Sequence, residues 1–91
     1  MDFEWDERKN EANIIKHGIS FLGAVRIFDR PTLEFVDTRR DYGETRIAAI
    51  GLLENREIYV IYTMRGQVCR IISARRARRD ERRAYRQIFP G

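Results

Sequence analysis

Two runs of apolar and β-branched residues, 58–63 and 68–73, dominate the second half of the chain. Such runs are typical of β-strands. The short connector between them contains Gly66, which can adopt a positive φ angle at little steric cost. The pattern therefore predicts a β-hairpin at the centre of the fold, with Thr63 opposite Val68.

The register of this hairpin decides which side chains share a face of the sheet. Strict alternation places Arg70 on one face and Arg75 on the other. We expect Leu53 of the preceding strand to lie opposite Glu57. In that register one face carries a polar group near one end of the sheet: Glu44, Arg46, Tyr62, Ser73 and Arg75.

The N-terminal residues predict a short edge strand and then a helix. Phe3 and Trp5 alternate with acidic residues. Asp6 is a suitable N-cap and Gly18 a suitable C-terminal cap, which frames a helix over about residues 7–17.

This helix has an apolar side and a polar side. A helical wheel of residues 7–17 places Ala12, Ile14 and Ile15 on the broad apolar side. The opposite arc holds Lys9, Asn13, Lys16 and His17. This polar stripe is either a solvated surface or one wall of a site, and a helix C-terminus by itself favours a cationic imidazole.

The middle of the chain predicts a second helix and two strands. Ser20 caps a helix whose apolar positions follow the i, i+3, i+4, i+7 spacing of a core-facing stripe: Phe21, Ala24, Val25 and Phe28. Strand patterns occupy 32–37 and 46–53, and the loop 37–45 between them has mixed charge without apolar periodicity. A turn at 54–56 leads into the central hairpin.

After Ala74 the chain is rich in helix formers until Pro90, which predicts a C-terminal helix. Its inward stripe is Ala77, Glu81, Ala84, Tyr85 and Ile88, and its outward side holds Arg79, Arg82, Arg83 and Arg86. Glu81 on the inner side indicates an ion pair with a sheet arginine such as Arg75. The whole pattern predicts one α+β domain over 1–91, with two N-terminal helices, an antiparallel sheet of about four strands and a C-terminal helix.

Charge is distributed unevenly along the chain. Residues 1–45 contain ten acids and seven bases, whereas residues 46–91 contain four acids and eleven bases. Arginine suits bidentate contacts to phosphate, so the basic half predicts a nucleic acid or an acidic protein as partner. Arginines in a sheet can instead pair with carboxylates.

Composition excludes several other classes of protein. One cysteine and one histidine leave no internal disulfide and no recognisable metal site. We expect no cofactor. The absence of a long apolar run and of a signal-peptide pattern predicts a soluble, cytoplasmic protein.

Several short motifs together resemble the BrnT toxin family over nearly the whole chain. The most specific are Lys16-His17-Gly18 and the run Arg70-Ile71-Ile72-Ser73-Ala74-Arg75. The other matching positions are Trp5-Asp6, Lys9, Asn13, Phe21, Ala24, Phe28, Glu44, Arg46, Gly51, Tyr62-Thr63, Glu81 and Tyr85.

The resemblance implies a RelE-like ribonuclease toxin of a type II toxin–antitoxin system, which cleaves mRNA without a metal. It also implies a BrnA-like, DNA-binding antitoxin as partner, with operator DNA bound only through that antitoxin.

RNA cleavage needs a base for the 2′-hydroxyl, cations for the phosphorane and an acid for the leaving oxygen. His17 is the natural acid or base, and Glu44 is the alternative base. The predicted catalytic residues are Lys16, His17, Glu44, Arg46 and Arg75. The predicted substrate-binding residues are Lys9, Tyr62, Arg65, Arg70 and Arg79. Composition is equally compatible with a non-catalytic nucleic-acid-binding module or co-repressor that acts with an antitoxin.

Overall fold

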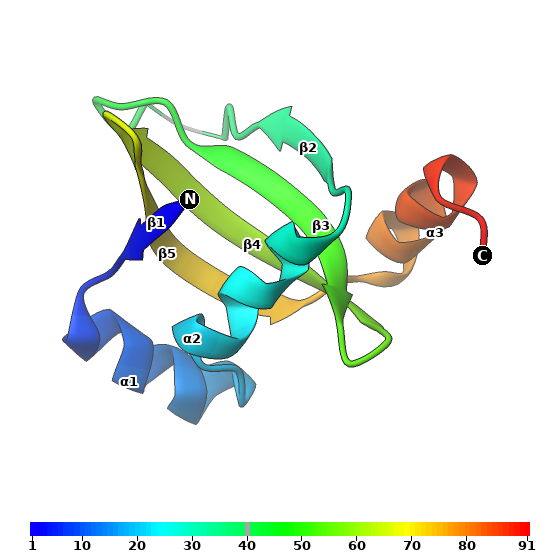
Figure 1. Cartoon of the computed structure of the whole chain (residues 1–91), viewed down its shortest axis with the longest axis horizontal. Coiled ribbons are helices and arrows are strands. Elements are labelled where there is room, and N and C mark those ends of the chain that lie inside the picture. The colour runs from blue at the N-terminus through cyan, green and yellow to red at the C-terminus, as the bar shows by residue number, and fades with distance from the viewer. Residues whose placement is uncertain (40) are drawn as a thin grey trace.

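The structure is a computed structural model that describes residues 1–39 and 41–91. Its centre is a twisted five-stranded sheet with helices packed on both faces (Figure 1). The elements in chain order are β1 (Asp2–Glu4), α1 (Glu7–His17), α2 (Phe21–Ala24), the 3₁₀ helix η1 (Val25–Asp29), β2 (Leu33–Val36), β3 (Ile47–Leu53), β4 (Arg56–Arg65), β5 (Val68–Arg76) and α3 (Arg79–Ile88). Arg40, in the predicted loop, lies outside the described residues.

The strand order is β1-β5-β4-β3-β2, so the predicted hairpin of β4 and β5 does lie inside the sheet. The α+β class is confirmed, with two corrections. The sheet has five strands where about four were expected, and β1 pairs with β5 in parallel, so the sheet is not wholly antiparallel. Phe3 anchors β1 because its ring stacks on Phe28, with centroids 5.6 Å apart.

The predicted register was wrong at both turns because each turn is tighter than expected. Leu53 pairs with Arg56, and Arg65 pairs with Val68. Glu54 and Asn55 both have positive φ angles, 51° and 64°. Two such residues form the kind of turn whose twist matches that of the flanking strands, so no longer loop is needed. At the second turn Gly66 takes a φ of 62°.

A β-bulge in β5 overturns the expectation that Arg70 and Arg75 face opposite ways. Ser73 pairs with Ile61 and Ile71 pairs with Tyr62, which leaves Ile72 as an extra residue. An extra residue shifts the alternation of side chains by one position. Arg70 and Arg75 therefore share one face of the sheet.

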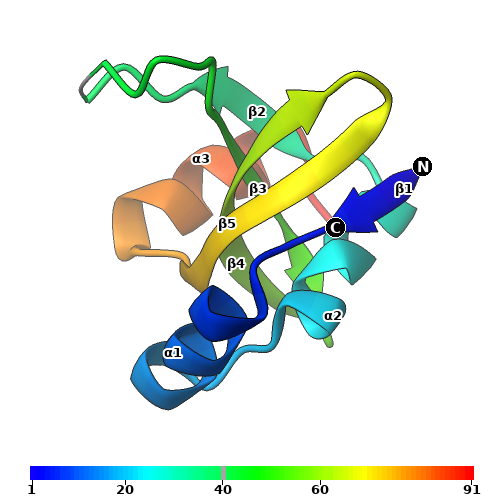
Figure 2. The same ribbon diagram turned by 90° about the vertical axis from the view of Figure 1, so that its left-hand side faces the viewer.

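Each face of the sheet has its own apolar core. On one face α1, α2 and η1 cover a cluster that includes Phe21, Ile27, Val60 and Tyr62. Helix α3 lies on the other face of the sheet (Figure 2). It packs on a smaller cluster that includes Tyr59, Ile61 and Tyr85. Tyr62 thus lies on the opposite face from Arg75, which corrects the predicted polar group.

Helix α1 has the predicted bounds and caps but turns a different side to the core. Asn10 and Asn13 are its buried residues, whereas Ile15 is 88% exposed and Ile14 is 42% exposed. Strand β1, which lies beside the outer edge of β5, pairs with it only as far as Arg70. Beyond that point the outer edge of β5 needs other hydrogen-bond partners, and α1 supplies them through asparagine.

Small residues in β3 let a helix approach closely. A Cβ atom added at Gly51 would lie 2.8 Å from the Cβ of Ile27 in η1. Real Cβ atoms do not approach each other so closely, so η1 rests directly on the backbone of β3.

Helix α3 begins later than the sequence suggested because β5 stays paired with β4 as far as Arg76. Ala77 and Tyr85 are buried as predicted, but Ile88 is 59% exposed and the half-buried Phe89 packs against the core in its place. Arg86 ties the helix to β4 through two hydrogen bonds to Glu57, of 2.8 and 3.2 Å.

Candidate active site

A hollow of about 370 Å³ opens on the face of the sheet that α3 partly covers. The C-terminal end of α1, strands β4 and β5, the link to α3 and the loop after β2 surround it. Figure 2 shows the loop and α3 projecting on the same side of the sheet. The lining residues are Lys16, His17, Arg39, Tyr59, Ile61, Ser73, Arg75 and Arg78.

His17 sits at the last turn of α1, where the chain reverses through Gly18. Gly18 has a φ of 72° and its N–H donates to the carbonyl of Ile14, which ends the helix and leaves the half-buried imidazole at the hollow. Burial lowers the pKa of His17 below its usual 6.5, and the charges of Lys16 and Arg75 lower it further. This direction is opposite to the effect of the helix macrodipole alone, and it favours the neutral form of the imidazole.

The pKa of His17 can be measured directly, because it is the only histidine in the chain. We expect the single imidazole resonance in an NMR titration to have a midpoint below 6.5. Replacing Lys16 by glutamine removes one repelling charge and should raise the midpoint. A midpoint above 6.5 in the native protein would contradict this electrostatic picture.

Arg75 is held rigidly at the floor of the hollow. Its guanidinium donates to both carboxylate oxygens of Glu81, at 2.8 and 2.9 Å, which confirms the predicted ion pair. Its Cζ atom lies 4.0 Å from the centroid of the Tyr59 ring. The hydrogen bonds to Glu81 raise the pKa of Arg75. Arg75 therefore keeps a fixed orientation, although Glu81 compensates its charge.

Two cations in the hollow lack such compensation. Among the described residues, Lys16 and Arg78 form no ion pair within 4 Å, whereas Arg39 pairs with Asp37 at 2.9 Å. The backbone N–H of Arg78 donates to Glu81 at 2.7 Å, and Arg78 is an exposed residue. A phosphate entering the hollow would thus meet Lys16 and Arg78 beside the imidazole of His17.

The predicted residues Glu44, Arg46 and Arg65 form a separate cluster toward the tip of the β4–β5 hairpin. The carboxylate of Glu44 lies 3.6 Å from Arg46 and 3.7 Å from Arg65. The guanidinium of Arg46 stacks on the ring of Tyr42 at 4.0 Å. None of the three predicted residues lines the hollow.

The remaining predicted substrate-binding residues are also dispersed. Arg70 forms an ion pair of 2.6 Å with Glu4 of β1. Tyr62 donates a hydrogen bond to Glu34 on the opposite face, and burial raises the pKa of Tyr62. Lys9 is exposed on α1 outside the hollow, and Arg79 lines a different hollow on α3.

Four residues of the hollow belong neither to the predicted site nor to the predicted polar group: Arg39, Tyr59, Ile61 and Arg78. Tyr59 lies directly opposite Arg75, so the correct register would have found it. Arg78 directly precedes α3 and Arg39 lies in the long loop, positions that carry no distinguishing pattern.

The residues present do not suggest a metal centre. Among the described residues, no group of three or more histidine, cysteine or acidic side chains is placed to hold an ion. Cys69 is buried in β5, and burial raises the pKa of its thiol to about 11. It therefore acts as a small apolar residue.

The family follows from the sequence match to a family model. Residues 5–81 match the model described as the ribonuclease toxin, BrnT, of type II toxin–antitoxin systems. The chain belongs to the BrnT toxin family. The match spans α1 through the first turn of α3 and so includes every residue that lines the hollow. Among curated proteins, no sequence matches this chain.

The family is one of ribonuclease toxins, and each of its type II systems pairs a toxin with an antitoxin. No helix in the described part of this BrnT chain is long and apolar enough to cross a membrane.

Proposed function

We propose that this BrnT protein is an endoribonuclease that cleaves mRNA without a metal ion, and that its active site is the hollow around His17. The observation that carries the proposal is the position of His17, which is half-buried at the hollow beside Lys16 and Arg78, two cations without an ion pair among the described residues. The imidazole of His17 is suited to accept a proton at pH 7, because its pKa lies below the operating pH.

The reaction is an internal transfer at phosphorus. His17 takes the proton of a 2′-hydroxyl, and the 2′-oxygen forms a bond to the adjacent phosphorus. The bond from phosphorus to the 5′-oxygen breaks, and that oxygen receives a proton from the Lys16 ammonium. The products are a 2′,3′-cyclic phosphate and a 5′-hydroxyl. Arg75 and Arg78 stabilise the negative charge of the phosphorane as it forms.

The two arginines differ in what they contribute. Arg75 is oriented by Glu81 and by the Tyr59 ring, so it offers fixed N–H donors to a phosphate oxygen. Arg78 has no acidic partner among the described residues and supplies net positive charge. A preorganised donor needs little rearrangement during the reaction, whereas an uncompensated charge draws the anionic substrate toward the site.

The biological setting follows from the family. We infer that the protein acts in the cytoplasm, that translation is inhibited through loss of mRNA, and that a BrnA-like antitoxin neutralises it. In this setting the toxin reaches operator DNA only through the antitoxin, and the fold is RelE-like.

One observation favours a second function. Arg46, Arg65, Arg70 and Arg86 are each within 4 Å of a carboxylate, so much of the positive charge stabilises the fold. A protein of this kind could act as a non-catalytic co-repressor that binds an acidic antitoxin. It would then cause little toxicity.

Incubation of the purified protein with RNA tests the proposal directly. We expect cleavage that persists in excess EDTA and leaves 2′,3′-cyclic phosphate ends. Expression in bacteria should arrest growth, and the combined changes Lys16→Ala and His17→Ala should relieve the arrest. A folded native protein that neither cleaves RNA nor slows growth would favour the co-repressor.

A further inference from the structure

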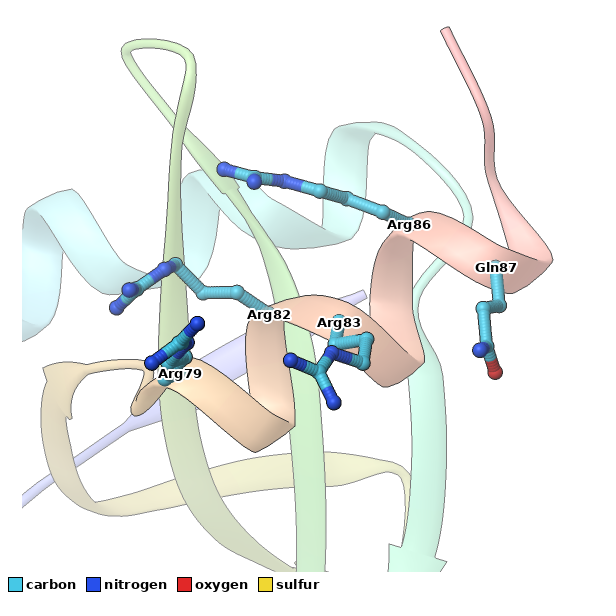
Figure 3. A pocket seen from close by; sticks show the side chains of 5 residues that line it. All are labelled: Arg79, Arg82, Arg83, Arg86 and Gln87. Carbon is cyan, nitrogen blue, oxygen red and sulfur yellow. The ribbon is translucent and has the colours of Figure 1, made fainter.

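The outer side of α3 carries a second basic hollow, separate from the proposed active site. It has a volume of about 390 Å³ and is lined by Arg79, Arg82, Arg83, Arg86 and Gln87. Figure 3 shows the guanidinium groups of Arg79, Arg82 and Arg83 near one another beside the first turns of the helix, with the side chain of Arg86 stretched out separately above them.

Two of these four arginines have partners within the protein, and the other two do not. Arg82 donates to the carbonyl of Ala77 at 2.8 Å, and Arg86 pairs with Glu57. Arg79 and Arg83 are exposed and form no hydrogen bond or ion pair among the described residues. The fold does not need their charge, and like charges this close repel one another.

Position along the chain connects this surface to the proposed active site. Arg78 lines the first hollow, and its neighbour Arg79 lines the second. Positions 79, 82, 83 and 86 recur at the three- and four-residue spacing that places side chains on one side of a helix. Basic groups therefore continue from the active site along α3.

We propose that α3 binds the sugar–phosphate backbone of the RNA substrate at nucleotides beyond the cleaved bond. This proposal rests on the proposed function, since it extends the same substrate. The hollow has four guanidinium groups and one amide but no apolar or aromatic lining residue. Protein interfaces usually have an apolar or aromatic centre, whereas backbone contacts to nucleic acid are made largely by arginine and lysine. The lining thus favours RNA over an acidic protein segment.

The proposal predicts that affinity depends on RNA length. A trinucleotide reaches only the active site, whereas a 12-mer also reaches α3. The combined changes Arg79→Gln and Arg83→Gln should lower affinity for the 12-mer about tenfold or more and reduce the slope of log affinity against log salt by about 1.4. Affinity for the trinucleotide should not change.

The experiment uses fluorescent 2′-O-methyl RNA, which lacks the reacting hydroxyl, so binding is measured whether or not the protein cleaves RNA. A variant with Arg8→Gln and Arg26→Gln is the matched control, because it also loses two exposed arginines but outside the α3 hollow. Circular dichroism checks that both variants fold as the native protein does.

The outcomes separate this proposal from the proposed function. One outcome is that the native protein binds the 12-mer through α3 but does not cleave ordinary RNA. This result would overturn the proposed nuclease activity and leave the proposed RNA-binding surface on α3 supported. Equal 12-mer affinities and salt slopes in the two variants would overturn the α3 surface. So would a variant that keeps its RNA affinity and loses affinity for the antitoxin.

Discussion

Replacing His17 by alanine is expected to lower the rate of RNA cleavage about 10²- to 10⁴-fold, the usual contribution of a positioned general base. The change removes the only imidazole in the chain but leaves the cations of the hollow in place. Affinity for uncleavable RNA should therefore change little. The measurement is single-turnover cleavage of a labelled RNA, with binding followed separately.

The pH dependence gives this prediction a second readout. In the native protein the rate should fall as the pH decreases through the pKa of His17, which lies below 6.5, because protonation removes the base. The His17→Ala variant should lack this acidic limb, and added imidazole should restore part of its rate. Arg8→Ala, at an exposed position of the same helix, serves as the control. Cleavage by His17→Ala at the native rate would refute the role of His17.

Replacing Asn13 by leucine is expected to lower the free energy of unfolding by about 3 kcal/mol. The buried Asn13 amide donates to the carbonyls of Ile19 and Ala74, each at 2.8 Å, and accepts from the N–H of Ala74 at 3.1 Å. Leucine has a similar size but leaves these backbone groups unpaired. For a domain of this length the loss corresponds to roughly 15 °C in Tm.

Urea and thermal unfolding measure this effect. Ala12→Leu is the matched control, because position 12 of α1 is exposed and should tolerate leucine within about 0.5 kcal/mol. Asn13→Asp adds a test of mechanism, since it places a carboxylate against two carbonyl oxygens. Burial raises the pKa of such a carboxyl, so this variant should gain stability as the pH falls. Equal stabilities of native protein and Asn13→Leu would contradict the assigned hydrogen bonds.

Local signals in the sequence were sufficient for most of the elements. The Asp6 and Gly18 caps defined α1, because the capping side chain and the left-handed glycine depend only on neighbouring residues. The Ser20 cap worked for the same reason. The α+β class and the pairing of Arg75 with Glu81 also followed from composition and spacing.

Features that depend on distant partners were not accessible. The helical wheel placed Ile15 on the core-facing side of α1. In the structure Asn13 lies on that side instead, because the unpaired edge of β5 needs its hydrogen bonds. The bulge at Ile72 changes the face of Arg75, and no local pattern marks it. Of the predicted catalytic residues, the hollow contains Lys16, His17 and Arg75. Whether Glu44 and Arg46 contribute to catalysis stays a prediction.

The amide of Asn13 joins a helix made early in synthesis to a strand made late. On the ribosome, Lys16 and His17 emerge well before Ala74, Arg75 and Arg78, which complete the same hollow. A nascent chain that ends before β5 therefore carries His17 and Lys16 without Arg75 and Arg78, the two arginines of the proposed active site. With the active site at this hollow, as proposed, the order of residues along the chain keeps the toxin inactive until β5 and the link to α3 have been made.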